Sequence, residues 1–330
     1  MDAETVGRDY LKDVDCPVIN CVFTHNRDYL PSSTDYDAII FHVGEAKNGS
    51  EWNEPRFRRY DQVYVMANKE SPILTKRNLT LYNNFFNMTL TYRLDSDVLW
   101  SYGMVFDIET GAVVAPSKGA KWRKPEAVHD PKVLKLIKSK SKMATWFVSH
   151  CKAFSNRDLL AKRLQQFIDV DIYGKCGNPI CPRDIAGTCL DMLNSTYKFY
   201  FAFENSICTD YMTEKVFLNM DNYVIPILYN GVTDMQHFLP PKSYINVNDF
   251  NSIKELANYL KFLDINPQEY ANYFWWKKYY KIKFRPDNFT FCNMCVKLNE
   301  WRDQRKIQQY PDLDTWYNYQ TCKDKVKDFV

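Results

Sequence analysis

Short apolar segments rich in β-branched and aromatic residues recur along the chain and alternate with segments of helical pattern. These segments are residues 36–43, 61–67, 143–149, 170–174, 198–203 and 224–228. Strands that alternate with helices are typical of layered α/β domains. The chain is therefore predicted to be α/β, and its length of 330 residues is enough for two such domains.

Two sequence patterns predict where helices begin. Ser155 stands three residues before Asp158, which indicates an N-cap for a helix whose leucines face a sheet. Ser252 and Glu255 form a capping-box pattern for a second helix that runs to residue 262. Both helices fall in the second half of the chain and support a second α/β domain there.

A basic segment at residues 118–142 separates the two halves. It carries nine basic residues against Glu126 and Asp130, contains Pro125 and Pro131, and follows Pro116. This composition indicates a solvated linker or surface helix. We predict a first α/β domain at residues 1–142 with the basic segment at its end, a second α/β domain at residues 143–285, and a C-terminal tail at residues 286–330. In open α/β sheets, ligands bind outside the carboxyl ends of the strands, so a cleft between the domains is expected.

Composition limits the kind of ligand. The chain has only 10 glycines and lacks both the G-x-G-x-x-G and the G-x-x-x-x-G-K-[ST] pattern, which disfavours a phosphate-binding glycine loop. Its 43 basic and 40 acidic residues leave a formal charge of +3, too little to argue for a nucleic-acid partner. An anionic ligand therefore has to be held by a local cluster of residues.

Cysteines and glycosylation sequons favour the secretory lumen. Ten cysteines are present, with Cys16 and Cys21 near one end and Cys292 and Cys295 near the other. Asn-x-Ser/Thr sequons occur at Asn48, Asn78, Asn87, Asn194 and Asn288. A zinc site built from the two cysteine pairs is the cytosolic alternative. The first 15 residues are polar and no apolar run spans a bilayer, so we expect that a signal or anchor has been removed.

The run FAFENSICTDYMTEKVF at residues 201–217 concentrates residue types that carry chemistry. A strand that ends at Phe203 would deliver the next residues to its carboxyl edge, and Asp210 would cap a following helix. Helix amides and a lysine favour an anion, and a carboxylate accepts hydrogen bonds from sugar hydroxyls, so the run suits a nucleotide sugar. Ordinary solvated charges in a first helical turn are an equally weighted alternative for Glu214 and Lys215.

The same run resembles the signature of the α1,3/4-fucosyltransferases, glycosyltransferase family 10. That signature contains FENS, D-Y-x-T-E-K and a strand with V-P-[IV]. Further matching segments follow the family order, namely MANKESP (66–72), MTLTYRLDSDVLWSYG (88–103), WFVSHCKAFSNR (146–157), DIYGKCG (171–177) and the C-x-x-C at Cys292. The resemblance covers nearly the whole lumenal part of such an enzyme, and the family's cytoplasmic tail, membrane helix and stem are missing from the match.

The resemblance implies a fold and an activity. The fold is of the GT-B type, with two Rossmann-like domains facing a central cleft. The acceptor-binding domain comes first, here residues 1–142, and the GDP-fucose-binding domain comes second, here residues 143–285. The activity is inverting transfer of fucose from GDP-fucose to the 3-hydroxyl of an N-acetylglucosamine in N-glycans. The cysteine-rich segment 174–193 is similar to that of invertebrate members, which slightly favours the core GlcNAc over antennary N-acetyllactosamine. The implied location is the Golgi lumen, with membrane attachment only through the missing anchor.

The resemblance also assigns roles to individual residues. Glu70 is the implied general base, which removes the proton of the acceptor hydroxyl. Arg157 and Lys215 are implied to hold the diphosphate, where cations meet the charge of the leaving group. Tyr211 and Glu214 are implied to contact guanine, ribose or fucose, in a pocket also lined by Glu204, Asn205 and Ser206.

No metal or other cofactor is expected. The triplet Asp95-Ser96-Asp97 fits the D-x-D metal signature of other glycosyltransferases, but such triplets recur in this chain, and the family places this one in the acceptor domain. A structural or acceptor-side role is favoured for both aspartates. A catalytically inactive carbohydrate-binding module on the same fold is the alternative function. We further expect Cys16 and Cys21 to be tied to Cys292 and Cys295, which would attach the tail to the acceptor domain.

Overall fold

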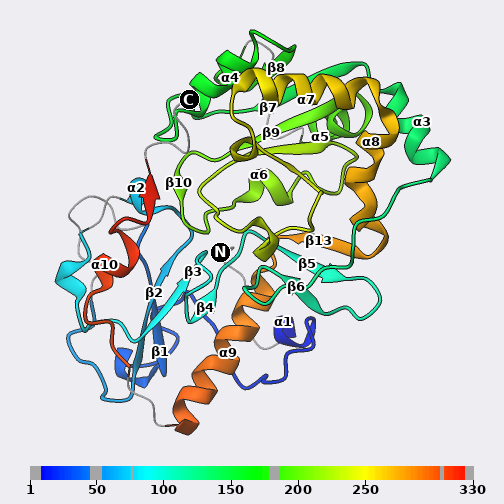
Figure 1. Ribbon diagram of the computed structural model, residues 1–330. Helices are drawn as coiled ribbons and strands as arrows, with labels where there is room; N and C mark the ends of the chain where they lie inside the picture. Colours follow the sequence, from blue (N-terminus) through cyan, green and yellow to red (C-terminus); the bar gives the residue numbers. More distant parts are fainter. Residues whose placement is uncertain (1–8, 45–53, 76–77, 178–185, 305–307, 324–330) are drawn as a thin grey trace. The chain divides into compact units, whose positions relative to one another are not determined.

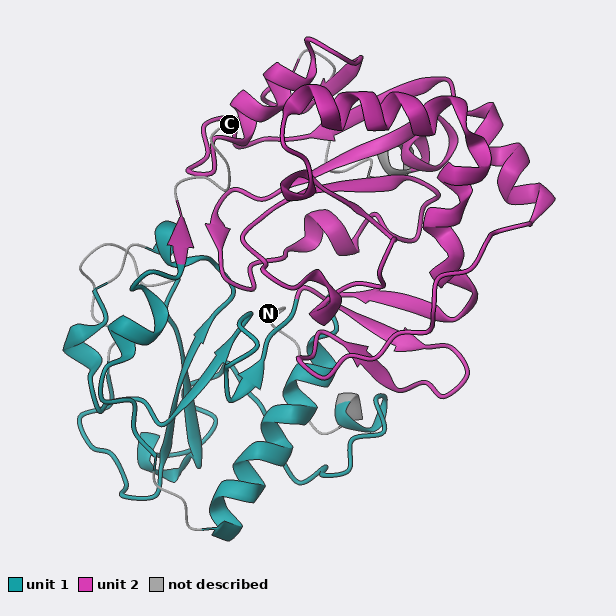
Figure 2. Ribbon diagram, viewed as in Figure 1, with its two compact units in different colours: residues 1–101, 285–321 teal, residues 102–284, 322–330 magenta. Residues whose placement is uncertain are grey.

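The structure is a computed structural model that describes residues 9–44, 54–75, 78–177, 186–304 and 308–323 (Figure 1). The chain divides into two compact units (Figure 2). Unit 1 comprises residues 1–101 and 285–321, and unit 2 comprises residues 102–284 and 322–330. Each unit contains a parallel sheet, so the α/β prediction is confirmed for both.

The unit 1 sheet has the order β1-β2-β3-β4, and its strands are parallel. These strands are β1 (Ala38–His42), β2 (Val63–Asn68), β3 (Met88–Thr91) and β4 (Val98–Leu99). From Tyr64 to Asn68, β2 is buried on both faces, which explains its continuous apolar run. Helix α9 (Asp287–Gln304) contributes Met294 and Trp301 to the core of this sheet.

Two disulfides hold the C-terminal segment on unit 1. Cys16 is bonded to Cys292 and Cys21 to Cys295, with Cα–Cα distances of 5.6 and 5.8 Å. Cys16, Cys292 and Cys295 belong to a small apolar cluster that includes Leu11, and Cys21 packs against it. The predicted pairing is confirmed, and these cysteines bond to each other instead of forming a zinc site.

The unit 2 sheet has the order β12-β11-β9-β7-β8 and is also parallel. Its strands are β7 (Lys142–Phe147), β8 (Val170–Tyr173), β9 (Tyr197–Phe203), β11 (Ile225–Tyr229) and β12 (Ile245–Asn246). All four strands predicted in this half of the chain are present. Helices α4 (Arg157–Leu164) and α7 (Ile253–Ile265) pack against each other and bury apolar side chains in the core of this sheet.

A second, antiparallel sheet explains why the units divide the chain differently from the predicted domains. Strand β5 (Gly103–Asp107) pairs with β6 (Val113–Ala115) and with β13 (Tyr280–Phe284). Because β5 pairs with β13, residues from 102 onward belong to unit 2, whereas the predicted first domain ends at residue 142. The predicted basic linker therefore lies inside unit 2, where its residues 131–139 form α3 (Pro131–Ser139) capped by Asp130.

One of the two predicted helix starts is wrong. Helix α4 (Arg157–Leu164) begins after Asn156, which adopts a left-handed conformation with φ 54°. Ser155 is buried, and its hydroxyl donates to the Glu204 carbonyl at 2.7 Å, so it is not available as a cap. Helix α7 (Ile253–Ile265) begins as predicted, because the Ser252 hydroxyl accepts from the Glu255 amide.

Shorter elements complete the described part. In unit 1 they are α1 (Asp9–Lys12), α2 (Pro72–Thr75), α10 (Leu313–Tyr317) and the 3-10 turns Ser33–Asp35 and Thr80–Tyr82. In unit 2 they are α5 (Ala186–Ser195), α6 (Glu214–Phe217), α8 (Pro267–Ala271), the 3-10 turns Met235–His237, Val247–Asp249 and Asn272–Lys278, and the pair β10 (Ile207–Cys208) and β14 (Cys322–Lys323). Within the described ranges, no helix has the length and hydropathy that a membrane span requires.

Candidate functional site

A buried carboxylate lies at the carboxyl edge of the unit 2 sheet. Strand β9 ends at Phe203, and Glu204 follows with no solvent exposure. One carboxylate oxygen accepts from the Thr213 amide at 2.8 Å, and both accept from the Thr213 hydroxyl at 2.9 Å. Burial raises the pKa of Glu204, and the neighbouring Lys215 opposes that shift.

Lys215 supplies the positive charge at this edge. Its Nζ lies 3.0 Å from Oε2 of Glu204 and 3.3 Å from Oε1 of Glu214, and it donates to the Thr213 hydroxyl at 2.7 Å. Burial alone would lower the pKa of Lys215, but Glu204 and Glu214 outweigh burial, and the net shift is upward. The ammonium is therefore charged at neutral pH, and 19% of the side chain remains exposed.

Glu214 is the more accessible of the two carboxylates. Its side chain is 42% exposed, whereas that of Glu204 is fully buried. Burial raises its pKa, but the charge of Lys215 outweighs burial, so the pKa of Glu214 falls below its usual value. Glu214 is thus ionised and open to hydrogen-bond donors such as sugar hydroxyls.

The helix start at this edge differs from the prediction. Helix α6 has only four residues, and its N-cap is Thr213 instead of Asp210, which adopts a left-handed φ of 59°. The Thr213 amide already donates to Glu204. The positive charge for an anion at this edge therefore comes from side chains and not from a long helix dipole.

Arg157 lies below the surface of the same unit. It is 4% exposed, and its two terminal nitrogens donate to the carbonyls of Phe203 at 2.8 Å and His150 at 3.0 Å. Burial lowers its pKa, and Glu204 opposes that shift. Its Nε has no hydrogen-bond partner among the described residues. Arg157 thus ties the carboxyl end of β9 to the loop after β7.

The other donor-site candidates differ in exposure. Ser206 and Tyr211 are interior, with exposures of 0% and 1%, and the Tyr211 ring lies edge-on to Tyr102 at 6.4 Å. Asn205 is partly exposed, and its carbonyl accepts from the Ser155 amide at 3.1 Å. The structure therefore brings Glu204, Glu214 and Lys215 into contact, while Ser206 and Tyr211 are buried residues of the same unit.

Glu70 lies in unit 1, just beyond the carboxyl end of β2, and is exposed. Its amide donates to Oδ1 of Asn68 at 3.1 Å, and its carbonyl accepts from the Tyr317 hydroxyl. Nδ2 of Asn68 in turn donates to the Tyr317 hydroxyl at 2.8 Å. Asn68 and Tyr317 are fully buried, so helix α10 holds the turn that carries Glu70. Sequence reasoning missed both residues, because they lie 249 positions apart.

A cation and an aromatic ring lie at the same edge as Glu70. The Nζ of Lys69 lies 5.0 Å from the centre of the Trp100 ring and 3.4 Å from Oδ1 of Asp287. The Trp100 indole donates to that same oxygen at 2.9 Å. Asp287 thus fixes the Trp100 ring next to strand β4, where the ring is buried in the core of the unit 1 sheet.

The D-x-D triplet has structural partners in unit 1. Asp95 receives two hydrogen bonds from Arg93, at 2.8 and 2.6 Å. Asp97 accepts from the Thr89 amide at 2.9 Å and from the Tyr310 hydroxyl at 2.7 Å. Within the part of the chain that the structure describes, no group of three or more acidic, His or Cys side chains could hold a metal ion.

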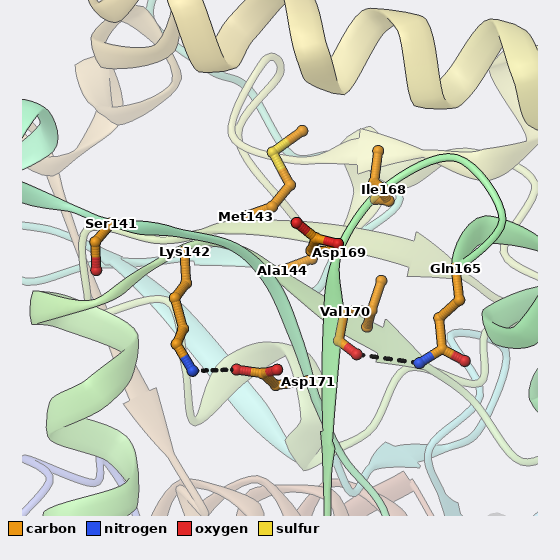
Figure 3. A pocket seen from close by; sticks show the side chains of 9 residues that line it. All are labelled: Ser141, Lys142, Met143, Ala144, Gln165, Ile168, Asp169, Val170 and Asp171. Atoms are coloured by element: carbon orange, nitrogen blue, oxygen red, sulfur yellow. Dashed lines mark hydrogen bonds and ion pairs between the residues drawn. The ribbon is translucent and has the colours of Figure 1, made fainter.

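A cavity of about 420 Å³ lies at the opposite edge of the unit 2 sheet (Figure 3). Its lining includes Lys142 and Val170, the first residues of β7 and β8. Lys142 and Asp171 close one side with an ion pair of 2.6 Å. The residues around Glu204 follow the carboxyl end of β9, so this cavity is not the candidate donor site.

Comparisons with known proteins identify the family. Residues 137–316 match the family model described as glycosyltransferase family 10 (fucosyltransferase), C-terminal, and residues 4–103 match the fucosyltransferase N-terminal model. The chain belongs to glycosyltransferase family 10. The resemblance read from the sequence motifs is thereby confirmed, and so is the prediction that the chain is an enzyme of the α1,3-fucosyltransferase group.

Individual family 10 relatives cover almost the whole chain. Alpha-(1,3)-fucosyltransferase C of Drosophila melanogaster is 42% identical over 97% of this chain and 74% of its own length. Glycoprotein 3-alpha-L-fucosyltransferase A of the same species is 33% identical over 98% of this chain, which spans 61% of that relative.

A solved family 10 structure supports the fold. An α1,3-fucosyltransferase crystallised with GDP aligns with a TM-score of 0.52 and 16% identity, over 88% of this chain and 84% of the other. The predicted fold class, α/β of the GT-B type, is therefore confirmed.

Proposed function

We propose that this chain transfers fucose from GDP-fucose to the 3-hydroxyl of an N-acetylglucosamine in N-glycans, with inversion at the anomeric carbon. The observation that carries the proposal is the Lys215–Glu204 pair at the carboxyl edge of the unit 2 sheet, the edge where open α/β sheets bind ligands. Lys215 is charged and part-exposed, as a group that meets a diphosphate has to be.

The proposed donor site lies in unit 2. Lys215 neutralises the charge that develops on the diphosphate as the bond from fucose to the β-phosphate breaks. Glu214, ionised and accessible, accepts hydrogen bonds from hydroxyls of the donor. Arg157 contributes a buried positive charge, and its Nε has no hydrogen-bond partner among the described residues. The part-exposed Asn205 and the buried Ser206 and Tyr211 belong to the same proposed donor pocket. Because two cations serve the leaving group, we propose that the reaction requires no metal.

The proposed base is Glu70 of unit 1. In a single displacement, the acceptor oxygen attacks the anomeric carbon, Glu70 takes the hydroxyl proton, and GDP departs. A base works only when it is held in place, and the Asn68 and Tyr317 hydrogen bonds fix the main chain on both sides of Glu70. The exposure of Glu70 leaves room for a large acceptor.

We propose the core GlcNAc as the first acceptor and antennary N-acetyllactosamine as the second. The family 10 relative that is 33% identical is named as a glycoprotein 3-α-L-fucosyltransferase, which supports a glycoprotein acceptor. Residues 178–185 of the cysteine-rich segment that favours the core lie outside the described residues. The disulfides and sequons support action in the lumen of the Golgi.

The test is incubation with GDP-fucose and a panel of core-only and N-acetyllactosamine-bearing N-glycans, with and without EDTA, followed by mass mapping. We expect one added fucose on GlcNAc, unchanged by EDTA. Glu70→Gln should lower kcat about 100-fold or more with donor affinity retained, while Lys278→Ala, at an exposed ion pair, should act as wild type. Donor binding without transfer to any glycan would instead support the inactive carbohydrate-binding module.

A further inference from the structure

A second cavity lies in unit 1, at the edge of the sheet opposite to Glu70. Its volume is about 890 Å³, within the 300–1,000 Å³ typical of ligand pockets. The lining includes Ala38 and Val63, where β1 and β2 begin, and side chains of helix α9. Glu70 follows the other end of β2, so at about 3.3 Å per residue some 20 Å of strand separate it from this cavity.

Exposed aromatic rings stand at the cavity. Tyr60 is 84% exposed and Tyr29 is 48% exposed, and both belong to the lining. Covering a large exposed aromatic side chain with a flat apolar surface is favourable, and the electron-rich face of the ring attracts polarised C–H groups. The C–H face of a pyranose ring is such a surface.

Oriented carboxylates stand beside these rings. The guanidinium of Arg59 forms ion pairs with Oδ1 of Asp61 at 2.5 Å and with Oδ1 of Asp37 at 3.3 Å. Its Nη1 donates to the Thr34 carbonyl at 2.8 Å. The side chains of Asp37 and Asp61 are 96% and 65% exposed, so each presents acceptor oxygens to the cavity. Carboxylates of this kind accept hydrogen bonds from sugar hydroxyls.

A buried acceptor lies deeper in the wall. Gln62 is 1% exposed, and its amide nitrogen donates to the carbonyls of Ser33 at 2.6 Å and Tyr36 at 2.8 Å. Its Oε1 accepts no hydrogen bond from any described residue. A hydroxyl that entered the cavity would satisfy this oxygen, whose isolation otherwise costs free energy.

The charge of the lining selects among ligands. The lining contains three acidic side chains, those of Asp35, Asp37 and Asp61, and two basic ones, those of Arg59 and Arg302, so it is net acidic. An anionic ligand such as a phosphate or a sialylated glycan is disfavoured, whereas a neutral polyol finds acceptors and aromatic faces together.

We propose that this cavity binds a neutral oligosaccharide, as a glycan-binding site separate from the edge that carries Glu70. The inference rests on the proposed function for the choice of N-glycans as ligands. At about 20 Å from Glu70, the site would hold a distant branch of a large acceptor and would leave a disaccharide acceptor unaffected.

Calorimetry of the whole chain tests the site without turnover. The titrant is a desialylated biantennary N-glycan, with a core-only N-glycan in excess to occupy the acceptor position. We expect Tyr60→Ala to weaken binding of the biantennary glycan about fivefold or more, in line with the loss of one aromatic contact. Adding Asp37→Asn to this variant should weaken that binding further. Leu81→Ala changes an 82% exposed apolar residue of the same unit that is not part of the lining, and should bind as wild type.

Kinetics separate this inference from the proposed function. Tyr60→Ala should raise KM for the biantennary acceptor about fivefold and leave its kcat unchanged. It should leave both constants for a core-only N-glycan unaltered. Equal affinity of wild type and Tyr60→Ala for the neutral glycan, or tighter binding of the sialylated form, would overturn the inference while fucose transfer remained. Tyr60-dependent binding without any transfer would overturn the proposed function alone.

Discussion

The Nζ of Lys215 lies 3.0 Å from Oε2 of Glu204, a carboxylate with no solvent exposure. Such a pair has little net effect on stability when intact, but loss of one partner leaves a buried, uncompensated charge. The same ammonium is the group that we propose for the diphosphate. Stability and donor binding therefore depend on one side chain.

Lys215→Met should impair both properties. We expect the free energy of unfolding to fall by about 3 kcal/mol, because Glu204 loses its counter-charge, and GDP affinity to fall about tenfold or more. The double variant Glu204→Gln, Lys215→Met should recover much of the stability and none of the GDP affinity. Urea unfolding and calorimetric GDP titration measure the two effects, and recovery of GDP binding in the double variant would contradict the assignment.

Tyr317→Phe should affect turnover through the turn that carries Glu70. The change removes one hydroxyl that donates to the Glu70 carbonyl and accepts from Asn68. We expect stability to fall by about 1–3 kcal/mol, since Asn68 loses a buried partner, and kcat to fall more than KM changes. Tyr319→Phe, at a 63% exposed tyrosine two residues on, is the matched control. An unchanged kcat would show that this turn does not position the base.

Lys140 should make stability depend on pH. It is 4% exposed, its Nζ donates to the carbonyls of Leu193 and Tyr197 at 2.7 and 2.8 Å, and burial with the nearby Lys198 lowers its pKa from 10.5 to about 7. The unfolded chain therefore binds more protons than the folded chain between about pH 7 and 10.5, so this group stabilises the fold increasingly as pH rises through that window.

The measurement compares urea unfolding at pH 7 and pH 9.5. The free energy of unfolding of the wild type should rise by about 2–3 kcal/mol between the two pH values because of Lys140. Lys140→Met should lack this increase. Lys138→Met, at an exposed neighbour in α3, should keep it. A pH dependence that is equal in wild type and Lys140→Met would refute this explanation.

The two disulfides of unit 1 should contribute unequally to the free energy of unfolding when they are removed one after the other. Each alone closes a long loop, of 276 or 274 residues. When one is already in place, the other closes only the short segments between Cys16 and Cys21 and between Cys292 and Cys295. In the chain-entropy model, removing Cys21–Cys295 by double serine substitution should cost about 2–3 kcal/mol, and removing Cys16–Cys292 as well should cost about 5 kcal/mol more. Denaturant unfolding of the two variants checks the order, and equal increments would contradict the model.

Two of the sequons should behave in opposite ways. Asn87 is 5% exposed; its Oδ1 accepts from Arg58 and from the Tyr64 amide, and its Nδ2 donates to the Gln308 carbonyl at 2.8 Å. A glycan on that nitrogen is incompatible with the fold. Asn78 is exposed. In secreted protein, Asn78→Gln should remove one glycan by mass, whereas Asn87→Gln should remove none and should destabilise the chain by about 2 kcal/mol. An occupied Asn87 would contradict the structure.

The sequence predicted what depends on neighbours along the chain. Apolar runs located the strands, and the polar run after Phe203 located Glu204, Glu214 and Lys215 at a strand end, because periodicity and burial act within a few residues. The same local reasoning failed at Ser155, since a hydroxyl suited to capping donates instead to Glu204, 49 positions away.

Only the tertiary structure decided the long-range relationships. Strand β13 pairs with β5 and shifts the unit boundary, Tyr317 reaches Asn68 across 249 positions, and the aromatic and acidic lining of the unit 1 cavity gathers from separate segments. Such contacts depend on which surfaces meet once strands and helices have formed, and residue types alone do not contain that information. The sequence therefore determined the family and the residue types at the proposed donor edge, whereas folding determined which distant residues lie against them.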